Sequence, residues 1–493
     1  MFQKLLQWIQ GVLNKMLNIS SVKQALNLNV AITPFMAENL QKWSLMYINQ
    51  SPWLSSEIKS LNLPASIAAE LSRAVTIEME VQISGSARAD FLAEQMEKVV
   101  CNLRQYTEYA SAKGGLWFKP YIKGDSIFVD YVQADQGYPI AFDSNGNMTA
   151  CVFADVKTIG RDYYTRLEFH QMTDEGYRIT NTAFKSTTQN ALGIQVSLGV
   201  IDAWADLEPE AMITGIDKPL FAYFKMPFAN NIDPISPLGV SAYARAVDLI
   251  EQADRQWSDF LWEFESGRRA LYTDPLAFKK DTKTGNPILP DKRLYRLLDL
   301  NSKLDNKGLF EDWTPTLREV NLLNGLDAIL KKIEFNCGLA QGTISDPSTV
   351  ALTATEIKMS RQRTYATITD TQKSLEDALE NLLYAMDVWC TLGNLAPAGK
   401  YTSTYTFDDS IVSDHDTQFT QDTQLVTMNA MPKWRMLVRN LGLSEVEAKQ
   451  WVADSQGETP GLFGTTNPDP NAPDGINMPN DNMPDNMPVD VNA

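Results

Sequence analysis

Histidine and cysteine are scarce in this chain of 493 residues. The only histidines are His170 and His415, so a three-histidine metal site is excluded, and neither residue lies in a recognisable catalytic motif. The four cysteines are far apart and form no C-x-x-C pair: Cys101, Cys151, Cys337 and Cys390. This spacing indicates neither a disulfide framework nor a zinc ribbon, so we expect buried free thiols.

Nucleotide-binding and hydrolase motifs are also missing. The sequence has no G-x-S-x-G elbow, no H-E-x-x-H, no G-x-x-x-x-G-K-[ST] phosphate loop and no G-x-G-x-x-G after a strand. We therefore expect no cofactor, and any ATP-driven process that involves this protein must draw its energy from another subunit. Acidic residues are abundant, so a hydrolase with paired carboxylates remains an alternative.

Two short acidic patterns have some features of functional sites, but neither predicts one. Glu78 and Glu80 would share a face of a strand but diverge on a helix, which is the local pattern, so we expect solvated surface acids. A second group alternates like the first calcium ligands of an EF-hand loop: Asn467, Asp469 and Asn471. Ala472 and Met478 stand where that loop needs Gly and Glu, so no metal site is predicted.

Basic residues are fewer than acidic ones: the chain has 43 Lys and Arg residues and 61 Asp and Glu residues, for a formal charge of −18. Tight binding of nucleic acid relies on clustered cations that displace counterions from the phosphates. The charge balance therefore argues against a surface on which DNA wraps. It is compatible with a surface past which DNA slides, since a mostly acidic wall does not hold a duplex.

No apolar run approaches the roughly 18 to 20 residues that cross a bilayer. The first 20 residues place apolar side chains at helical spacing, but Gln and Lys interrupt them, which is unlike a signal peptide. We interpret this segment as an amphipathic helix of a cytoplasmic protein that docks on its own chain or on a neighbour. Binding to a membrane surface is the alternative.

The composition is that of a folded protein, with 44% hydrophobic, 21% charged and 10% aromatic residues. Its length predicts about three or four domains. Residues 31–112 have the apolar spacing of helices, whereas residues 114–228 contain short β-rich stretches separated by Gly-containing turns. These blocks predict helices followed by a sheet-rich domain.

Two apolar stripes predict long helices over residues 238–266 and 314–340. The first stripe consists of Ala246, Ile250, Ala253, Trp257, Phe260 and Phe264. The second consists of Leu322, Leu326, Ile329 and Ile333. Between the helices, residues 267–313 mix short strands with a turn and predict a small inserted module. Aromatic residues on the first helix are candidates for packing between subunits or against its partner helix: Trp257, Trp262 and Phe264.

A polar loop at residues 341–353 precedes another long helix, predicted to run to about residue 391. Thr353 and Glu356 fit a capping box at its start.

A short strand is predicted near residues 401–407, followed by two or three helices over residues 415–455. Ser444 and Glu447 fit a capping box for the last of them. From about residue 457 onward Pro, Asn, Asp and Gly dominate, so this tail is predicted to be disordered.

Six segments within roughly the first 390 residues each show a weakly specific sequence pattern, in the order 43–53, 63–75, 114–120, 132–135, 237–244 and 346–357. None is a catalytic signature, and the evidence for a resemblance comes from the order of the six segments. The pattern resembles the portal proteins of tailed phages that infect Gram-positive bacteria.

The resemblance implies an α+β portal architecture, in which an α-rich wing contains a mixed β-sheet and long stem helices lead to a small α/β clip. A tunnel loop and a helical crown follow. The implied boundaries are a wing region at 1–237 with its β-rich part at 114–228, stem helices at 238–266 and 314–340, a clip at 267–313, a tunnel loop at 341–353, a long wing helix and strand at 354–414, a crown at 415–456, and a disordered tail at 457–493.

The function implied by the resemblance is a non-enzymatic homo-oligomer, usually of twelve subunits, that forms a channel at one vertex of the capsid. Double-stranded DNA would be packaged through it by the terminase motor and later ejected. Expected partners are the terminase large subunit, capsid and scaffold proteins, and head-completion or connector proteins, without a membrane. The protein would belong to the virion and pass through the host cytoplasm during assembly.

Two groups of site residues follow from this mapping. The tunnel loop offers polar groups to phosphate without strong charge trapping, and its candidate DNA-facing residues are Thr343, Ser345, Asp346, Ser348 and Thr349. The clip is locally basic, and its candidates for contact with DNA, the motor or head-completion proteins are Lys279, Lys280, Lys283, Lys292 and Arg293. An ordinary connector and a solvated surface are the alternatives for the two groups. A membrane-associated pore or adaptor that uses the N-terminal helix is the remaining rival function.

Overall fold

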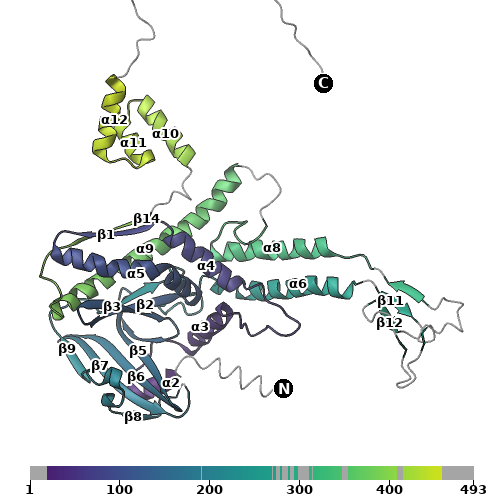
Figure 1. The fold of residues 1–493 in the computed structure, drawn as a ribbon, viewed down its shortest axis with the longest axis horizontal. Helices are drawn as coiled ribbons and strands as arrows, with labels where there is room; N and C mark the ends of the chain where they lie inside the picture. Colours follow the sequence, from purple (N-terminus) through teal and green to yellow (C-terminus); the bar gives the residue numbers. More distant parts are fainter. Residues whose placement is uncertain are drawn as a thin grey trace, which may run out of the picture. The chain divides into compact units, whose positions relative to one another are not determined.

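The computed structural model describes residues 19–189, 191–268, 270–273, 278–279, 287–288, 294–297, 310–313, 315–346, 354–407 and 415–457. The contacts divide the chain into two compact units, Met1–Val412 and Ser413–Ala493. The first unit combines long helices with β-sheets (Figure 1), so the predicted α+β class is confirmed. The first 18 residues of the predicted N-terminal helix and the tail after residue 457 lie outside the described residues.

Four helices precede the main sheets: α2 (Ile19–Leu26), α3 (Pro34–Tyr47), α4 (Leu63–Thr76) and α5 (Ala87–Lys113). The Ser86 hydroxyl caps α5 by accepting from the N–H of Ala89 at 3.3 Å, and the helix ends at Gly114 in the left-handed conformation. Its buried side chains recur at helical spacing: Leu92, Met96, Val99 and Leu103. The predicted helices over residues 31–112 are therefore confirmed, apart from one strand.

That strand is β1 (Met79–Ser84), so the prediction that Glu78 and Glu80 lie in a helix is wrong. β1 pairs antiparallel with β14 (Thr402–Phe407), and Glu80 stands opposite Thr406. The alternation of exposed and half-buried side chains along β1 is that of a strand, with Ile83 buried. The partner that decides between helix and strand here lies far along the chain, where a local pattern does not reveal it.

Two antiparallel sheets follow α5. The first has the order β10-β2-β3, formed by β2 (Gly115–Lys123), β3 (Ser126–Gln133) and β10 (Ala222–Lys225). The second has the order β4-β5-β6-β7-β8, with β9 also on β7, and consists of β4 (Gly137–Phe142), β5 (Met148–Ile159), β6 (Asp162–Thr173), β7 (Gly176–Ser186), β8 (Ile194–Val196) and β9 (Glu210–Ile213). The prediction of a mixed sheet in this region is wrong, because every described strand pairing in it is antiparallel. Short turns join most of the successive strands and leave no room for parallel crossovers.

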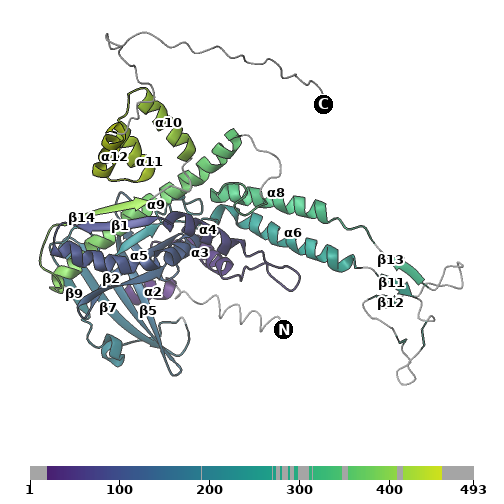
Figure 2. The same cartoon turned by 45° about the horizontal axis from the view of Figure 1, so that its top comes forward.

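Two long helices, α6 (Val247–Ser266) and α8 (Glu319–Cys337), run side by side and antiparallel (Figures 1 and 2). Both begin later than predicted. Residues 238–243 are not helical, and the 3-10 turn η3 (Ala244–Ala246) leads into α6, because the backbone at Gly239 packs against Gly114. The described strands between the helices form a small mixed sheet of β11 (Ala270–Thr273), β12 (Tyr295–Leu297) and β13 (Phe310–Trp313).

The longest helix is α9 (Ala354–Leu392), which confirms the helix predicted after the polar loop. Its predicted inner face is buried at Ile368, Leu375, Leu379, Leu382 and Met386, and it packs on β10 and β2. These side chains belong to one continuous core with α3, α4 and α5. Thr353 of the predicted capping box and the side chain of Ile357 lie outside the described residues.

The second unit contains three described helices, α10 (His415–Thr427), α11 (Lys433–Leu441) and α12 (Glu445–Gly457). The capping box predicted for α12 is confirmed. The N–H of Glu447 donates to the Ser444 hydroxyl at 3.3 Å, and the N–H of Ser444 donates to the Glu447 carboxylate at 3.1 Å. Between helices, Asp422 of α10 is buried and accepts from Arg439 and Asn440 of α11.

The four cysteines carry free thiols, as predicted, but only three of them are buried. Cys101 is exposed because it lies on the outward face of α5, between the buried Val99 and Leu103. Among the helices that the structure describes, none combines the length and the apolar character needed to span a membrane.

Candidate functional site

The segment that follows α8 contains the described part of the predicted DNA-facing residues. Thr343 and Asp346 are exposed, and the Thr343 hydroxyl donates to the carbonyl of Ala340 at 2.7 Å. Ser345 is different, because its side chain is buried and its hydroxyl donates to Glu334 at 2.8 Å. The hydroxyl of Ser345 is thus used inside the protein. Ser348 and Thr349 lie outside the described residues.

Glu334, in the last turn of α8, holds this segment in place. Its carboxylate is completely buried and accepts from the N–H groups of Ile344 at 2.6 Å and Ser345 at 2.8 Å. The N–H of Gly342 lies 3.3 Å from the second carboxylate oxygen, which also receives the Ser345 hydroxyl. We did not predict this residue from the sequence. The signal for it is an acidic residue one position after Ile333, on the buried face of the helix.

The predicted basic surface lies mostly outside the described residues. Lys279 is exposed, and its carbonyl accepts from the N–H of Ile288 at 2.8 Å. Lys280, Lys283, Lys292 and Arg293 are not among the described residues.

The paired helices α6 and α8 expose large apolar side chains. We call the set the helix-pair surface: Leu261, Trp262 and Phe264 of α6, and Val320 and Leu323 of α8. Trp262 is 63% exposed and Val320 is 61% exposed, although each lies on a long helix that already has a partner. Trp257 and Phe260 instead stack on each other along α6 at 5.3 Å between ring centroids. Exposed apolar clusters of this kind are typical of surfaces that pack against another chain.

Glu168 lies at the centre of an ion network that joins the two sheets. Lys119 of β2 contacts Glu168 of β6 at 2.7 Å and Asp130 of β3 at 3.3 Å. Arg166 and His170 also contact Glu168, at 3.0 and 2.9 Å. Burial acts to raise the pKa of Glu168, but Lys119, His170 and Arg166 outweigh it and hold that pKa well below its ordinary value. This carboxylate is therefore charged and paired with Lys119 and Arg166, as expected of a residue that stabilises the sheets.

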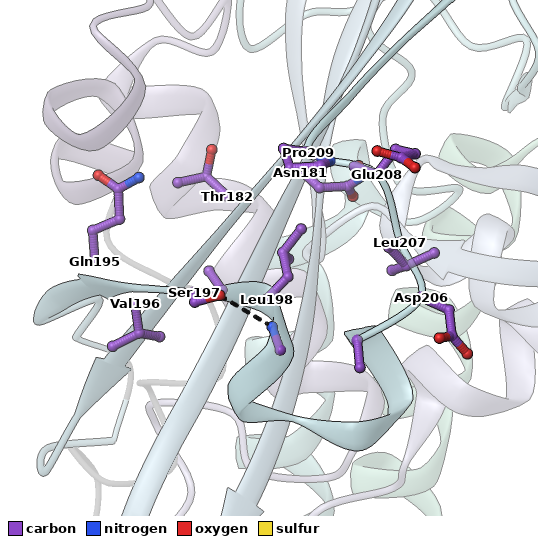
Figure 3. A pocket seen from close by; sticks show the side chains of 13 residues that line it. Asn181, Thr182, Gln195, Val196, Ser197, Leu198, Asp206, Leu207, Glu208 and Pro209 are labelled. Atoms are coloured by element: carbon purple, nitrogen blue, oxygen red, sulfur yellow. Dashed lines mark hydrogen bonds between the residues drawn. The ribbon is translucent and has the colours of Figure 1, made fainter.

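A hollow of about 580 Å³ opens beside β7, between β8 and the residues that lead to β9. Figure 3 shows its polar wall, with Asn181 and Thr182 on β7, Gln195 on β8, and Asp206 and Glu208 on the following loop. No His, Cys, Lys or Arg lines it. Across the described parts of the chain, no cluster of three or more His, Cys, Asp or Glu side chains has a geometry that could hold a metal ion.

An α+β body from which a pair of long antiparallel helices leads to a small separate sheet is the arrangement expected of a phage portal subunit. The sequence matches the family described as "Phage portal protein, SPP1 Gp6-like" over residues 94–461. This range covers most of the chain, including α6, α8 and all of the three described helices of the second unit. The chain therefore belongs to this family of phage portal proteins, which are head-to-tail connectors.

A solved structure similar to the chain is described as "Neck of native GTA particle computed with C12 symmetry". The two sequences are 11% identical, the likeness covers 86% of this chain and 98% of that one, and the TM-score is 0.42. No curated protein matches the sequence.

Proposed function

We propose that this portal protein assembles into a ring of twelve subunits whose central channel passes double-stranded DNA during packaging and ejection. The terminase motor supplies the energy, and capsid, scaffold and head-completion proteins attach to the outside of the ring. In this proposal the protein has no catalytic role of its own. It acts in the virion and assembles in the host cytoplasm.

The observation that carries the proposal is the helix-pair surface. A ring closes when one face of each subunit packs on a different face of the next, and long helices side by side supply both faces. Burial of a large apolar side chain contributes about 1.5–3 kcal/mol relative to its exposed state. Covering Trp262, Val320 and their neighbours on every subunit would therefore stabilise a ring.

The modules are assigned accordingly. α6 and α8 form the stem, residues 267–313 the clip, residues 341–353 the tunnel loop, and residues 415–456 the crown. The remaining helices and sheets before residue 414 form the wing, and α9 is its long helix. In this assignment the clip lysines face the motor, DNA or head-completion proteins.

The channel should let DNA pass without holding it. The hydroxyl proton of the exposed Thr343 already goes to the carbonyl of Ala340, so Thr343 holds phosphate weakly, and the exposed Asp346 repels it. The overall charge of −18 acts in the same direction, because few phosphate contacts mean little counterion release.

The first test is assembly. Negative-stain electron microscopy and light scattering of the purified protein should show rings with a central hole and a mass near twelve chains of 55.2 kDa. Trp262→Ser should reduce the ring fraction while leaving the circular dichroism spectrum unchanged. Ile194→Ser is the matched control, since Ile194 is 69% exposed on the sheet edge, away from the stem. A compact dimer without a channel would contradict the proposal.

The second test is DNA passage. Heads assembled around these rings, with the terminase and ATP, should protect double-stranded DNA from nuclease, and heads without the ring should protect none. Protection that is independent of the ring would contradict the proposed channel.

A further inference from the structure

Glu334 is a fully buried carboxylate on the helix that leads to the tunnel loop, and both its oxygens are used. The donors to Glu334 all come from residues 342–345. One side chain of α8 therefore accepts hydrogen bonds from the whole first turn of the segment that follows the helix. The same turn is closed within itself, because the N–H of Gly342 also donates to the Ser345 hydroxyl at 3.1 Å.

We propose that Glu334 is the positioning residue of the tunnel loop, fixing the start of the loop to the end of α8 so that the two move as one piece. The proposal rests on the proposed function of residues 341–353 as the DNA-facing loop. It assigns to Glu334 no contact with DNA.

The physical reason is the cost of removing the carboxylate. Hydrogen bonds to a charged acceptor are about twice as strong as neutral ones. Without Glu334 the N–H and hydroxyl of the buried Ser345 would lose their acceptor, and an unpaired buried donor costs about as much as a full hydrogen bond. The turn would then have to open toward solvent to satisfy its donors.

The end of α8 is also tied to α9. Gly338 ends α8 in the left-handed conformation, with φ of 72°, and its carbonyl accepts from the Thr367 hydroxyl at 3.1 Å. A side chain at Gly338 would collide with Thr367. Arg363 of α9 lies 4.0 Å from the centroid of the Phe335 ring. A displacement of the stem helix therefore reaches both the loop start and the wing helix through contacts on either side of Gly338.

Hydrogen–deuterium exchange of assembled full-length rings tests the anchor. In Glu334→Ala the amides of residues 342–345 should exchange at least about tenfold faster, as expected from the loss of a buried acceptor. Glu334→Gln should give a smaller increase, because its one remaining oxygen can still accept from Ile344 and Ser345. This second variant keeps the test decisive if Glu334→Ala fails to fold.

The matched control is Asp327→Asn on the same helix. Asp327 contacts Lys331 at 2.7 Å at the partly exposed surface, so its loss removes a carboxylate from α8 without touching the loop. Exchange in residues 342–345 should remain at the wild-type rate. Wild-type exchange in both Glu334 variants would overturn the proposal.

The rate of DNA packaging distinguishes a positioning role from a purely structural one. Glu334→Gln rings that assemble normally should package DNA more slowly than wild-type and Asp327→Asn rings. Normal packaging in spite of faster exchange would overturn the positioning role. If wild-type rings package no DNA, the proposed channel function fails, whereas the exchange result still decides whether Glu334 holds the loop.

Discussion

Arg318 and Glu263 join the end of α6 to the start of α8 through three contacts. Arg318 donates from Nη2 to Glu263 Oε2 at 2.6 Å and from Nε to Oε1 at 3.1 Å, and its backbone N–H adds a third bond to Oε1 at 3.0 Å. The Glu263 side chain is only 11% exposed, whereas that of Arg318 is 71% exposed. The glutamate is therefore the fixed half of the pair, and it holds the end of α6 against the start of α8.

The first prediction concerns the pH dependence of this junction. The Arg318 side chain and backbone N–H hold the pKa of Glu263 below its ordinary value. The stabilisation is fully present above the unfolded-state pKa of about 4.3 and is lost as the pH falls through the lower folded-state pKa. Hydrogen–deuterium exchange of the amides at the end of α6, corrected for the intrinsic pH dependence of exchange, should therefore accelerate as the pH falls through the folded-state pKa of Glu263.

Glu263→Gln should show the faster exchange at the end of α6 already at pH 7. Glu251→Gln is its control, because Glu251 pairs with Arg255 one turn away on the same helix, at 2.7 Å. Equal protection of Glu263→Gln and wild type across the whole pH range would contradict the prediction.

Helical periodicity alone predicted α5, α6, α8 and α9, because each carries apolar residues at helical spacing. It missed β1, whose partner β14 lies near the end of the first unit. The later start of α6 was also missed, since it depends on Gly239 meeting Gly114, a contact that no local pattern records.

Three of the six segments that carried the family resemblance, 43–53, 132–135 and 237–244, meet in space. The Tyr243 hydroxyl donates to the carbonyl of Trp43 at 2.9 Å, and the Ser44 hydroxyl donates to Asp135 at 3.1 Å. Lys113, just before the Gly114 segment, contacts the same Asp135. Soft patterns in a fixed order can thus mark one packed core, even though each segment taken alone is uninformative.

The candidate loop was predictable as a polar segment, but its internal order was not. Ser345 has a hydroxyl group of the kind that can donate to phosphate, yet this hydroxyl donates to the buried carboxylate of Glu334. Only the three-dimensional placement of an acid at the inner face of α8 separates Ser345 from the exposed Thr343.

The second prediction concerns His170, whose Nδ1 lies 2.8 Å from the Tyr177 hydroxyl and whose Nε2 lies 2.9 Å from Glu168. Burial lowers the pKa of His170 more than Glu168 raises it. Below about pH 6.5 the unfolded chain therefore binds a proton that the folded chain does not, and stability falls as the pH falls.

His170→Phe should cost about 1–3 kcal/mol at pH 7.5, because Tyr177 and Glu168 each lose a buried partner. Its further loss of stability between pH 7.5 and 5.5 should be smaller than in wild type, since the proton-binding group is gone. Thermal unfolding at the two pH values measures both effects. An unchanged difference between the two pH values would assign the acid sensitivity to other groups.

The third prediction concerns the capping box of α12. Ser444→Ala removes the acceptor for the N–H of Glu447 and should destabilise the start of the helix by about 1 kcal/mol. Amide exchange in the first turn of α12 should accelerate accordingly. Ser455→Ala is the control, because its hydroxyl only donates back to the carbonyl of Val452 within the helix. Faster exchange in the control as well would point to general fraying of α12 rather than to the cap.

The last prediction concerns the close approach of Gly114 to Gly239 in the core. Gly114 has φ of 90°, and an added Cβ would lie 2.6 Å from the carbonyl oxygen of Gly239. Gly114→Ala therefore combines a strained backbone, which costs on the order of 1–3 kcal/mol, with an overpacked contact of similar cost. Gly124→Ala separates the two, because Gly124 has φ of 61° but no atom within 4 Å of the added Cβ. Urea unfolding should show a loss of about 1–2 kcal/mol for Gly124→Ala and a clearly larger one for Gly114→Ala. Equal losses would mean that the backbone conformation alone, and not the close approach of the two segments, requires glycine at position 114.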